Sequence, residues 1–170
     1  LSSLGALALL FLAAFQENFQ QEWRTIQASA SNEDGPIGVQ LRQVVNPALG
    51  VSDRCVSCHV AMAPGEQTVT GLSILKAHTP VVHDPADFGC TVCHGGQGMA
   101  TKKDDAHGAV EFWPQPMIPA SMSEAGCGTC HVPLGVPNSR QLQQVNAVFA
   151  RLDCLACHRV DGRGGALRPG

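Results

Sequence analysis

The distribution of apolar residues changes sharply near the N-terminus. Residues 1–15 carry no charge and are almost entirely apolar, whereas residues 16–27 are polar and compatible with a continuing helix. A helix that crosses a bilayer needs about 20 apolar residues, which is more than this run provides. A secretory signal also has a short apolar core, followed by small residues near a cleavage site. Because the chain starts at Leu1 rather than Met, we expect residues upstream, and we favour a retained transmembrane helix that makes residues 1–29 a membrane anchor.

The next segment has the pattern of a linker. Residues 30–50 are rich in small and polar residues and contain Pro36, which is typical of a connection between folded parts. Ile37, Val39 and Leu41 alternate with less apolar positions and predict a short strand. Asn46-Pro47 predicts a turn before the main domain, residues 51–170.

A helical pattern appears near the C-terminus. Pro137-Asn138-Ser139 is typical of a helix start. The apolar residues that follow at helical spacing are Leu142, Val145, Phe149 and Leu152. They predict a helix that leads directly into Cys154.

The composition is unusual for a domain of 170 residues. Aromatic residues make up only 5% and Tyr is absent, whereas there are 18 glycines and 11 prolines. Such a chain has few large side chains from which to build a core. Charged residues are scarce at 15%, and the formal net charge is −3, so no basic surface for nucleic acid is indicated. The composition favours loops that wrap around large cofactors.

All eight cysteines belong to one repeated motif, Cys-x-x-Cys-His. We number its copies motif 1 (Cys55–His59), motif 2 (Cys90–His94), motif 3 (Cys127–His131) and motif 4 (Cys154–His158). This motif is the attachment site of c-type haem: the thiols of Cys55, Cys58, Cys90, Cys93, Cys127, Cys130, Cys154 and Cys157 would bind the porphyrins. The histidine after each second cysteine would become an axial ligand of the iron. The sequence therefore predicts four covalently bound haem c groups and a role in electron transfer.

Other uses of paired cysteines explain the motif less well. Two zinc sites of four thiolates would consume all eight cysteines, but zinc does not require a histidine after every second one. Four disulfides would leave the same four histidines unexplained. A redox dithiol motif occurs once, in a βαβ context that this sequence lacks.

The remaining histidines are candidates for the opposite axial positions. His59, His94, His131 and His158 are assigned to the proximal side by the motif. His78, His83 and His107 all lie between motifs 1 and 3 and are predicted distal ligands. His78 and His83 are separated by Pro80 and are expected to serve different irons.

One iron would still need a sixth ligand. The thioether candidates are Met62, Met99, Met117 and Met122. We favour Met117 or Met122, because the proline-rich segment that contains them could hold a ligand in place. A Met/His haem has a higher potential than a bis-histidine haem.

Two signatures resemble a known class of proteins. They are Asn46–Arg54 before motif 1 and Phe88–Gly98 around motif 2, together with the spacing of Ala106-His107, Trp113 and Pro116–Pro119. They are similar to membrane-anchored multihaem cytochromes c that accompany bacterial cytochrome b and Rieske-type quinol-oxidising complexes. The resemblance implies a subunit that relays electrons from such an integral membrane complex to a soluble periplasmic partner, with no substrate chemistry of its own. It also implies that the histidines at 78, 83 and 107 are axial ligands.

Further resemblances leave alternatives open. The plan of one anchor and four haems resembles tetrahaem quinol dehydrogenases and the cytochromes bound to photosynthetic reaction centres. Residues 137–170 resemble the start of a class I cytochrome c, which would continue further and supply a Met ligand. A haem redox enzyme with one open axial position and a filament-forming conductor are the remaining alternatives.

These observations together predict the fold class and the location. We expect a mostly α protein with extensive loops, wrapped around four covalent haems and preceded by an N-terminal transmembrane helix. The location expected is the bacterial inner membrane, with the haem domain on the periplasmic side.

Overall fold

The computed structural model describes residues 2–132, 135–165 and 167. The chain divides into two compact units, residues 1–117 and residues 118–170. Motifs 1 and 2 lie in the first unit, and motifs 3 and 4 lie in the second. The domain boundaries predicted after residues 29 and 50 stay predictions.

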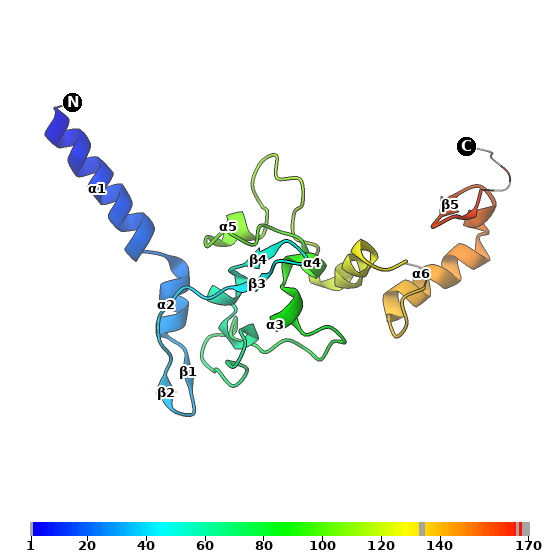
Figure 1. Cartoon of the computed structure of the whole chain (residues 1–170), viewed down its shortest axis with the longest axis horizontal. Coiled ribbons are helices and arrows are strands. Elements are labelled where there is room, and N and C mark those ends of the chain that lie inside the picture. Colours follow the sequence, from blue (N-terminus) through cyan, green and yellow to red (C-terminus); the bar gives the residue numbers. More distant parts are fainter. Residues whose placement is uncertain (1, 133–134, 166, 168–170) are drawn as a thin grey trace. The chain divides into compact units, whose positions relative to one another are not determined.

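The first unit begins with two helices that a short break separates. Helix α1 spans Ser3–Phe19 and helix α2 spans Glu22–Ala28 (Figure 1). Most apolar side chains of α1 are exposed, and no residue of this helix is buried. In contrast, α2 buries Trp23, Ile26 and Gln27 against the rest of the unit.

The predicted membrane anchor is wrong. Among the residues that the structure describes, no helix is long and apolar enough to span a bilayer. Helix α1 ends after 17 residues, and its last turns contain polar residues, including Glu17, whose carboxylate pairs with Lys102 at 2.8 Å. The structure thus gives no support for a transmembrane helix within residues 1–29, nor for the inner-membrane location that we inferred from it.

Two short antiparallel hairpins follow the helices. Strands β1 (Ser31–Asn32) and β2 (Gly35–Pro36) form the first hairpin. Strands β3 (Val44–Asn46) and β4 (Val51–Asp53) form the second, and the predicted turn at Asn46-Pro47 is confirmed because it joins them. The strand predicted over Ile37, Val39 and Leu41 is absent. That segment is irregular because the backbone amides of Gln40 and Arg42 donate to the side chains of Gln27 and Ser57 instead of to a second strand.

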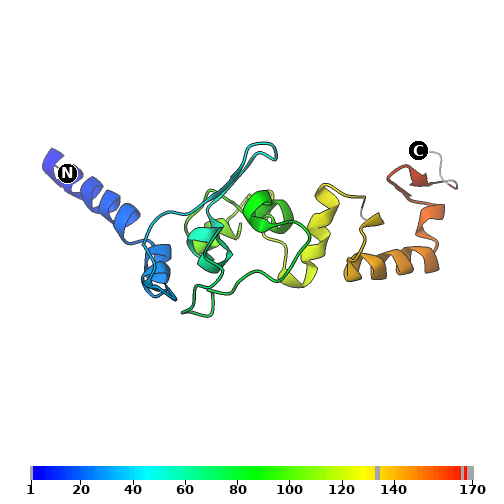
Figure 2. The same ribbon diagram turned by 60° about the horizontal axis from the view of Figure 1, so that its bottom comes forward.

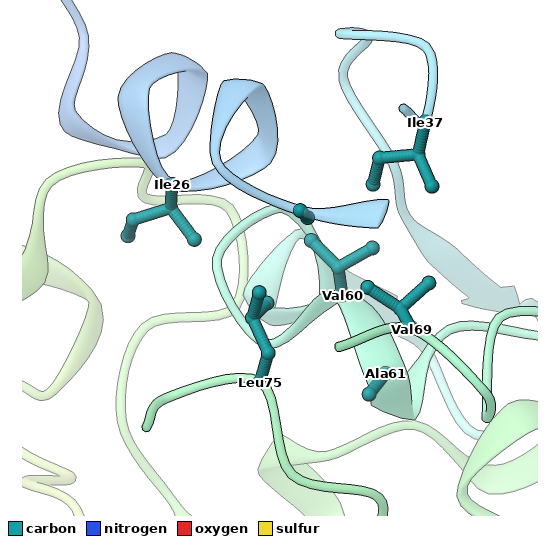
Figure 3. Packing of buried hydrophobic residues seen from close by; sticks show 7 residues of the cluster. Ile26, Ile37, Val60, Ala61, Val69 and Leu75 are labelled. Atoms are coloured by element: carbon teal, nitrogen blue, oxygen red, sulfur yellow. The ribbon is translucent and has the colours of Figure 1, made fainter. Parts of the chain in front are cut away.

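A small apolar core lies between α2 and the chain after motif 1. Figure 3 shows the cluster in which Ile26 of α2 and Ile37 approach Val60 and Ala61. Its other members are Ala30, Val69 and Leu75. Val60 and Ala61 belong to the 3-10 helix η2 (Val60–Met62), which follows His59 directly. The core therefore fixes the position of the motif 1 histidine.

The remaining helices of the first unit are single turns. The elements are the 3-10 helix η1 (Cys55–Ser57) and the helices α3 (Pro85–Phe88), α4 (Thr91–His94) and α5 (Lys103–Ala106). Helix α4 contains most of motif 2.

The second unit contains one longer helix. The 3-10 helix η3 (Ala120–Thr129) runs into motif 3, and helix α6 (Arg140–Arg151) precedes motif 4. The helix predicted after Ser139 is confirmed, with the Ser139 hydroxyl accepting a hydrogen bond from the Leu142 amide. In both overall views, α6 is followed by the turn η5 (Cys154–Ala156) and the hairpin of β5 (Arg159–Val160) and β6 (Arg163–Gly164) (Figures 1 and 2).

The prediction of a mostly α fold behind a transmembrane helix is therefore wrong. The α and 3-10 helices together account for less than half of the described residues, and the rest are hairpins, turns and loops. Glycines with positive φ end two of the short helices, α3 at Gly89 and α4 at Gly95.

Candidate haem-attachment sites

The four motifs share one backbone conformation. In each, the histidine amide donates to the carbonyl of the first cysteine, at 2.9 Å in motifs 1, 2 and 3 and 2.8 Å in motif 4. The amide of the second cysteine donates to the same carbonyl at 3.1–3.3 Å. This single turn places residues three and four apart on one side of the backbone, so both thiols and the imidazole can face the same group.

A buried polar network holds motif 1 against helix α2. Gln27 is fully buried and donates from Nε2 to the Ser57 carbonyl at 2.7 Å. Its Oε1 accepts a hydrogen bond from the Arg42 guanidinium at 2.6 Å. The Ser57 hydroxyl accepts from the Arg42 amide and donates to the Arg42 carbonyl. Arg42 also pairs with Glu66 at 3.1 Å, so its buried charge is balanced.

The structure brings two of the three predicted distal histidines opposite proximal ones. The ring of His107 lies 6.5 Å from the ring of His59, between centroids, with the planes inclined by 30°. The ring of His78 lies 6.2 Å from that of His94, with the planes inclined by 64°. Each pair combines a motif histidine with one from a loop between motifs 1 and 3.

These separations fit two imidazoles that bind one metal ion from opposite sides. A metal–imidazole bond of about 2 Å and a ring nitrogen about 1 Å from the ring centre give a centroid separation of about 6 Å. The Nδ1 atoms of His59 and His94 are buried without a hydrogen-bond partner in the described part of the chain. Burial first, and then the neighbouring His107, lowers the pKa of His59, while burial and then His78 lower the pKa of His94. Neutral imidazole is the form that binds a metal, so these residues fit haem iron.

The chain after motif 2 positions the histidine that faces motif 1. The amide of Gly96 donates to the Gln115 carbonyl, and that of Gln97 donates to the Ala106 carbonyl. Gly96 has a φ of +84°, and a Cβ atom there would meet the Ala106 oxygen at 2.5 Å. The amide of Met117 closes the loop on the His107 carbonyl at 2.9 Å. The glycines after motif 2 thus permit close approach to another backbone segment, which carries His107.

The first cysteines of motifs 1 and 2 lie side by side with a buried aspartate. The Sγ atoms of Cys55 and Cys90 and a carboxylate oxygen of Asp53 all lie within 4.8 Å of one another. A hydrogen bond between the thiols lowers the pKa of Cys55 and raises that of Cys90. Burial, followed by the Glu22 carboxylate, raises the pKa of Cys58 to about 11.

This cluster also meets the distance requirement for a small metal site, but its chemistry favours haem attachment. Both thiols belong to attachment motifs, and the Asp53 carboxylate already accepts three hydrogen bonds from the start of motif 2. The raised pKa of Cys90 opposes the thiolate form that a metal requires. Asp53 was not among the site residues predicted from the sequence, where the only signal for it is its place in the Asn46–Arg54 signature.

The other predicted ligands lie in different surroundings. The ring of His83 packs on Phe88, with centroids 4.5 Å apart. Met62 packs beside the buried cluster of Val44, Val56 and Ala63, and Met99 is half exposed. Met117 follows the His107 loop, and Met122 is exposed in η3 ahead of motif 3. The role of these side chains as axial ligands stays a prediction.

Motifs 3 and 4 lie closer to the surface than motifs 1 and 2. Cys130, His131, Cys157 and His158 are exposed. In this unit the Glu124 carboxylate accepts hydrogen bonds from the Ser139 hydroxyl and from the Gln141 amide, and so links η3 to the start of α6. These contacts, led by the one from Ser139, lower the pKa of Glu124.

One comparison with known proteins gave a match. The family described as cytochrome c554 and c-prime matches residues 14–95, slightly less than half of the chain, and this segment contains motifs 1 and 2. No curated protein and no solved structure was found to be similar to the chain. Together with the attachment motifs, the family match supports a multihaem c-type cytochrome that binds haem c covalently and transfers electrons.

Proposed function

We propose that this protein is an electron carrier with four haem c groups, one at each motif. The observation that carries the proposal is the common backbone turn of the four motifs, combined with two facing pairs of imidazoles in the first unit. Haem iron accepts and donates single electrons as it changes between the ferric and ferrous states.

The first unit would supply all ligands for two of the haems. Cys55 and Cys58 would hold the first haem, with His59 and His107 as its axial ligands. Cys90 and Cys93 would hold the second, with His94 and His78. The proximity of the Cys55 and Cys90 thiols supports a close approach of the two groups, which favours exchange of electrons between them.

The second unit would supply the proximal ligands of the other two haems. His131 and His158 follow their cysteines in the same turn as His59 and His94. Apolar residues beside these motifs, among them Val132 and Leu152, are exposed and provide surfaces that a porphyrin could cover. His83, Met117 and Met122 are the candidates for the distal positions that have no assigned ligand.

We further propose that the carrier relays electrons between a membrane quinol-oxidising complex and a periplasmic acceptor. The support is the resemblance of Asn46–Arg54 and Phe88–Gly98 to cytochromes of such complexes. The first segment runs from the last residue of β3 through β4 to Arg54, and the second surrounds motif 2. The two segments pack together through Asp53. Isolation of the native protein with its bound partners tests this, and co-purification without any quinol-oxidising subunit would contradict it.

A second candidate is a haem redox enzyme with one open axial position. It is favoured by the exposure of His158 at motif 4, where an external small molecule could reach the iron. An iron without a strong sixth ligand would bind an external small molecule there.

Two measurements test the proposed function. The intact mass should equal that of the polypeptide plus four haems, and the reduced protein should show the absorption bands of c-type haem. Exposure of the reduced protein to carbon monoxide then separates the candidates, because a haem with two protein ligands resists binding. A mass equal to the bare polypeptide would refute the haem assignment, and rapid stoichiometric binding of carbon monoxide would favour the enzyme.

A further inference from the structure

Asp53 is a buried carboxylate at the junction of the first two attachment motifs. Its side chain is 1% exposed, although it lies at the end of β4 and only two residues before Cys55. Its Oδ2 atom accepts hydrogen bonds from the amides of Cys90 at 2.5 Å and Thr91 at 2.7 Å. Its Oδ1 atom accepts one from the Thr91 hydroxyl at 2.8 Å. A residue next to motif 1 therefore holds the first turn of motif 2.

Two glycines that flank motif 2 make room for this carboxylate. A Cβ atom on Gly89 would meet Val51 Cγ1 first and then Asp53 Oδ2 at 2.8 Å, and one on Gly98 would collide with Asp53 Oδ1. The φ of Gly98 does not lie in the left-handed region, so the contact with Asp53, and not backbone conformation, disfavours a side chain there. Gly98 is thus adapted to Asp53, whereas Gly89 also has a φ of +81°, which by itself favours glycine.

The next residue holds the other end of motif 2. The amide of Arg54 donates to the Gly98 carbonyl at 2.7 Å, and its guanidinium donates to the Met99 carbonyl at 3.1 Å. Asp53 and Arg54 together bind the segments on both sides of motif 2. The two motifs are thereby fixed relative to one another through backbone groups.

The charge of Asp53 is not balanced by a salt bridge among the described residues, where the two ion pairs join Arg42 to Glu66 and Lys102 to Glu17. Its carboxylate also lies beside the Cys55 and Cys90 thiols, within 4.8 Å. A buried anion stabilises the ferric state, which carries one more positive charge than the ferrous state, and the effect is strong where water is excluded.

We propose that Asp53 is a positioning residue that sets motif 2 beside motif 1 and that its charge lowers the reduction potential of the haems bound there. The proposal rests on the proposed attachment of haem at these motifs. It assigns to Asp53 both the geometry of the pair and part of its electrostatics.

The first test removes the charge and keeps the shape. In Asp53→Asn, the amide oxygen can still accept from the Cys90 and Thr91 amides, and the new NH₂ group can donate to the Thr91 hydroxyl. We expect this variant to retain four haems by mass. The reduction potential of one or more haems should rise by about 59 mV or more, which is a tenfold change in the equilibrium constant of a one-electron couple. Asp34→Asn, an exposed aspartate in the β1–β2 turn, is the matched control and should leave every potential unchanged.

The second test keeps the charge and removes the space for it. Gly98→Ala should displace the Asp53 side chain and reduce attachment of haem at motif 2, measured by mass mapping of the peptide that contains Cys90 and Cys93. Gly38→Ala is the control, because a Cβ atom at that exposed position would meet no atom within 4 Å.

The outcomes separate this proposal from the proposed function. A wild-type protein without haem would refute the proposed function itself. A wild-type protein with four haems, combined with an Asp53→Asn variant that is fully loaded and unchanged in potential, would refute only the role of the Asp53 charge. A Gly98→Ala variant with normal attachment of haem at motif 2 and normal potentials would overturn the positioning role.

Discussion

At the scale of single residues, the first unit is organised around histidine pairs and buried polar groups. Burial lowers the pKa of His59 and His94, and these residues face His107 and His78 at the distance expected of two ligands on one metal ion. The Gln27 network then fixes motif 1 in place. Each arrangement predicts the effect of a single substitution.

We expect His107→Met to raise the potential of one haem. A thioether ligand favours the ferrous state more than an imidazole does. The reduction potential should therefore rise by about 59 mV or more, which is a tenfold change in the equilibrium constant between the ferric and ferrous states. Spectroelectrochemical titration of the purified protein measures it. Val110→Met places the same side chain elsewhere in the loop and should have no such effect, whereas four unchanged potentials in His107→Met would contradict the assignment of His107.

We expect Gln27→Ala to destabilise the first unit. The change leaves the buried Ser57 carbonyl and the Gln40 amide without their partner, at a cost of about 1–3 kcal/mol. Chemical denaturation followed by circular dichroism gives the free energy of unfolding. The exposed Gln67→Ala is the control, and an equally small effect of both substitutions would show that the network contributes little.

At the scale of elements, single turns and short hairpins replace long helices. The motif turn recurs four times with the same hydrogen bonds, whereas the elements around it differ: a hairpin precedes motif 1, and helix α6 precedes motif 4. Helix α6 depends at its start on a contact with η3 through Glu124 and Ser139.

The Glu124 contact should respond to pH. Its pKa is lowered in the folded chain from 4.5, so the stabilisation is fully present above 4.5 and is lost as the pH falls through the lowered value. We expect Glu124→Gln to speed hydrogen exchange of the Gln141 and Leu142 amides near neutral pH. The difference from wild type should vanish in acid; a difference that persists there would exclude the carboxylate as its source.

At the scale of the whole molecule, the chain consists of two compact units with two motifs each. The first unit contains two pairs of facing histidines, so the ligands proposed for two haems all precede residue 118. The family match lies within this unit as well.

We expect replacement of Cys127 and Cys130 by alanine in the full chain to remove one haem only. The mass should fall by one haem, and the electron paramagnetic resonance signals of the haems at motifs 1 and 2 should be unchanged because their proposed ligands all precede residue 118. Loss of a second haem, or altered signals from the first unit, would contradict the independence of the two units.

The sequence by itself determined the attachment chemistry. Cysteines and histidines at fixed spacing define the motif whatever surrounds it, because two thiols and an imidazole within five residues lie on one turn of the backbone. The turn at Asn46-Pro47 and the helix after Ser139 were also predictable, since turn residues and helical periodicity act locally. The transmembrane helix was predicted wrongly because a short apolar run does not determine where a helix ends.

Only the tertiary structure decided which residues meet across long separations in the chain. Nothing in the sequence distinguishes His107 as the partner of His59, because the pairing depends on how the loop after motif 2 folds back through Gly96 and Gln97. The burial of Asp53 likewise depends on contacts 37 and 38 residues away. Local patterns fix bonds within a turn, whereas contacts between distant segments depend on the packing of the whole unit.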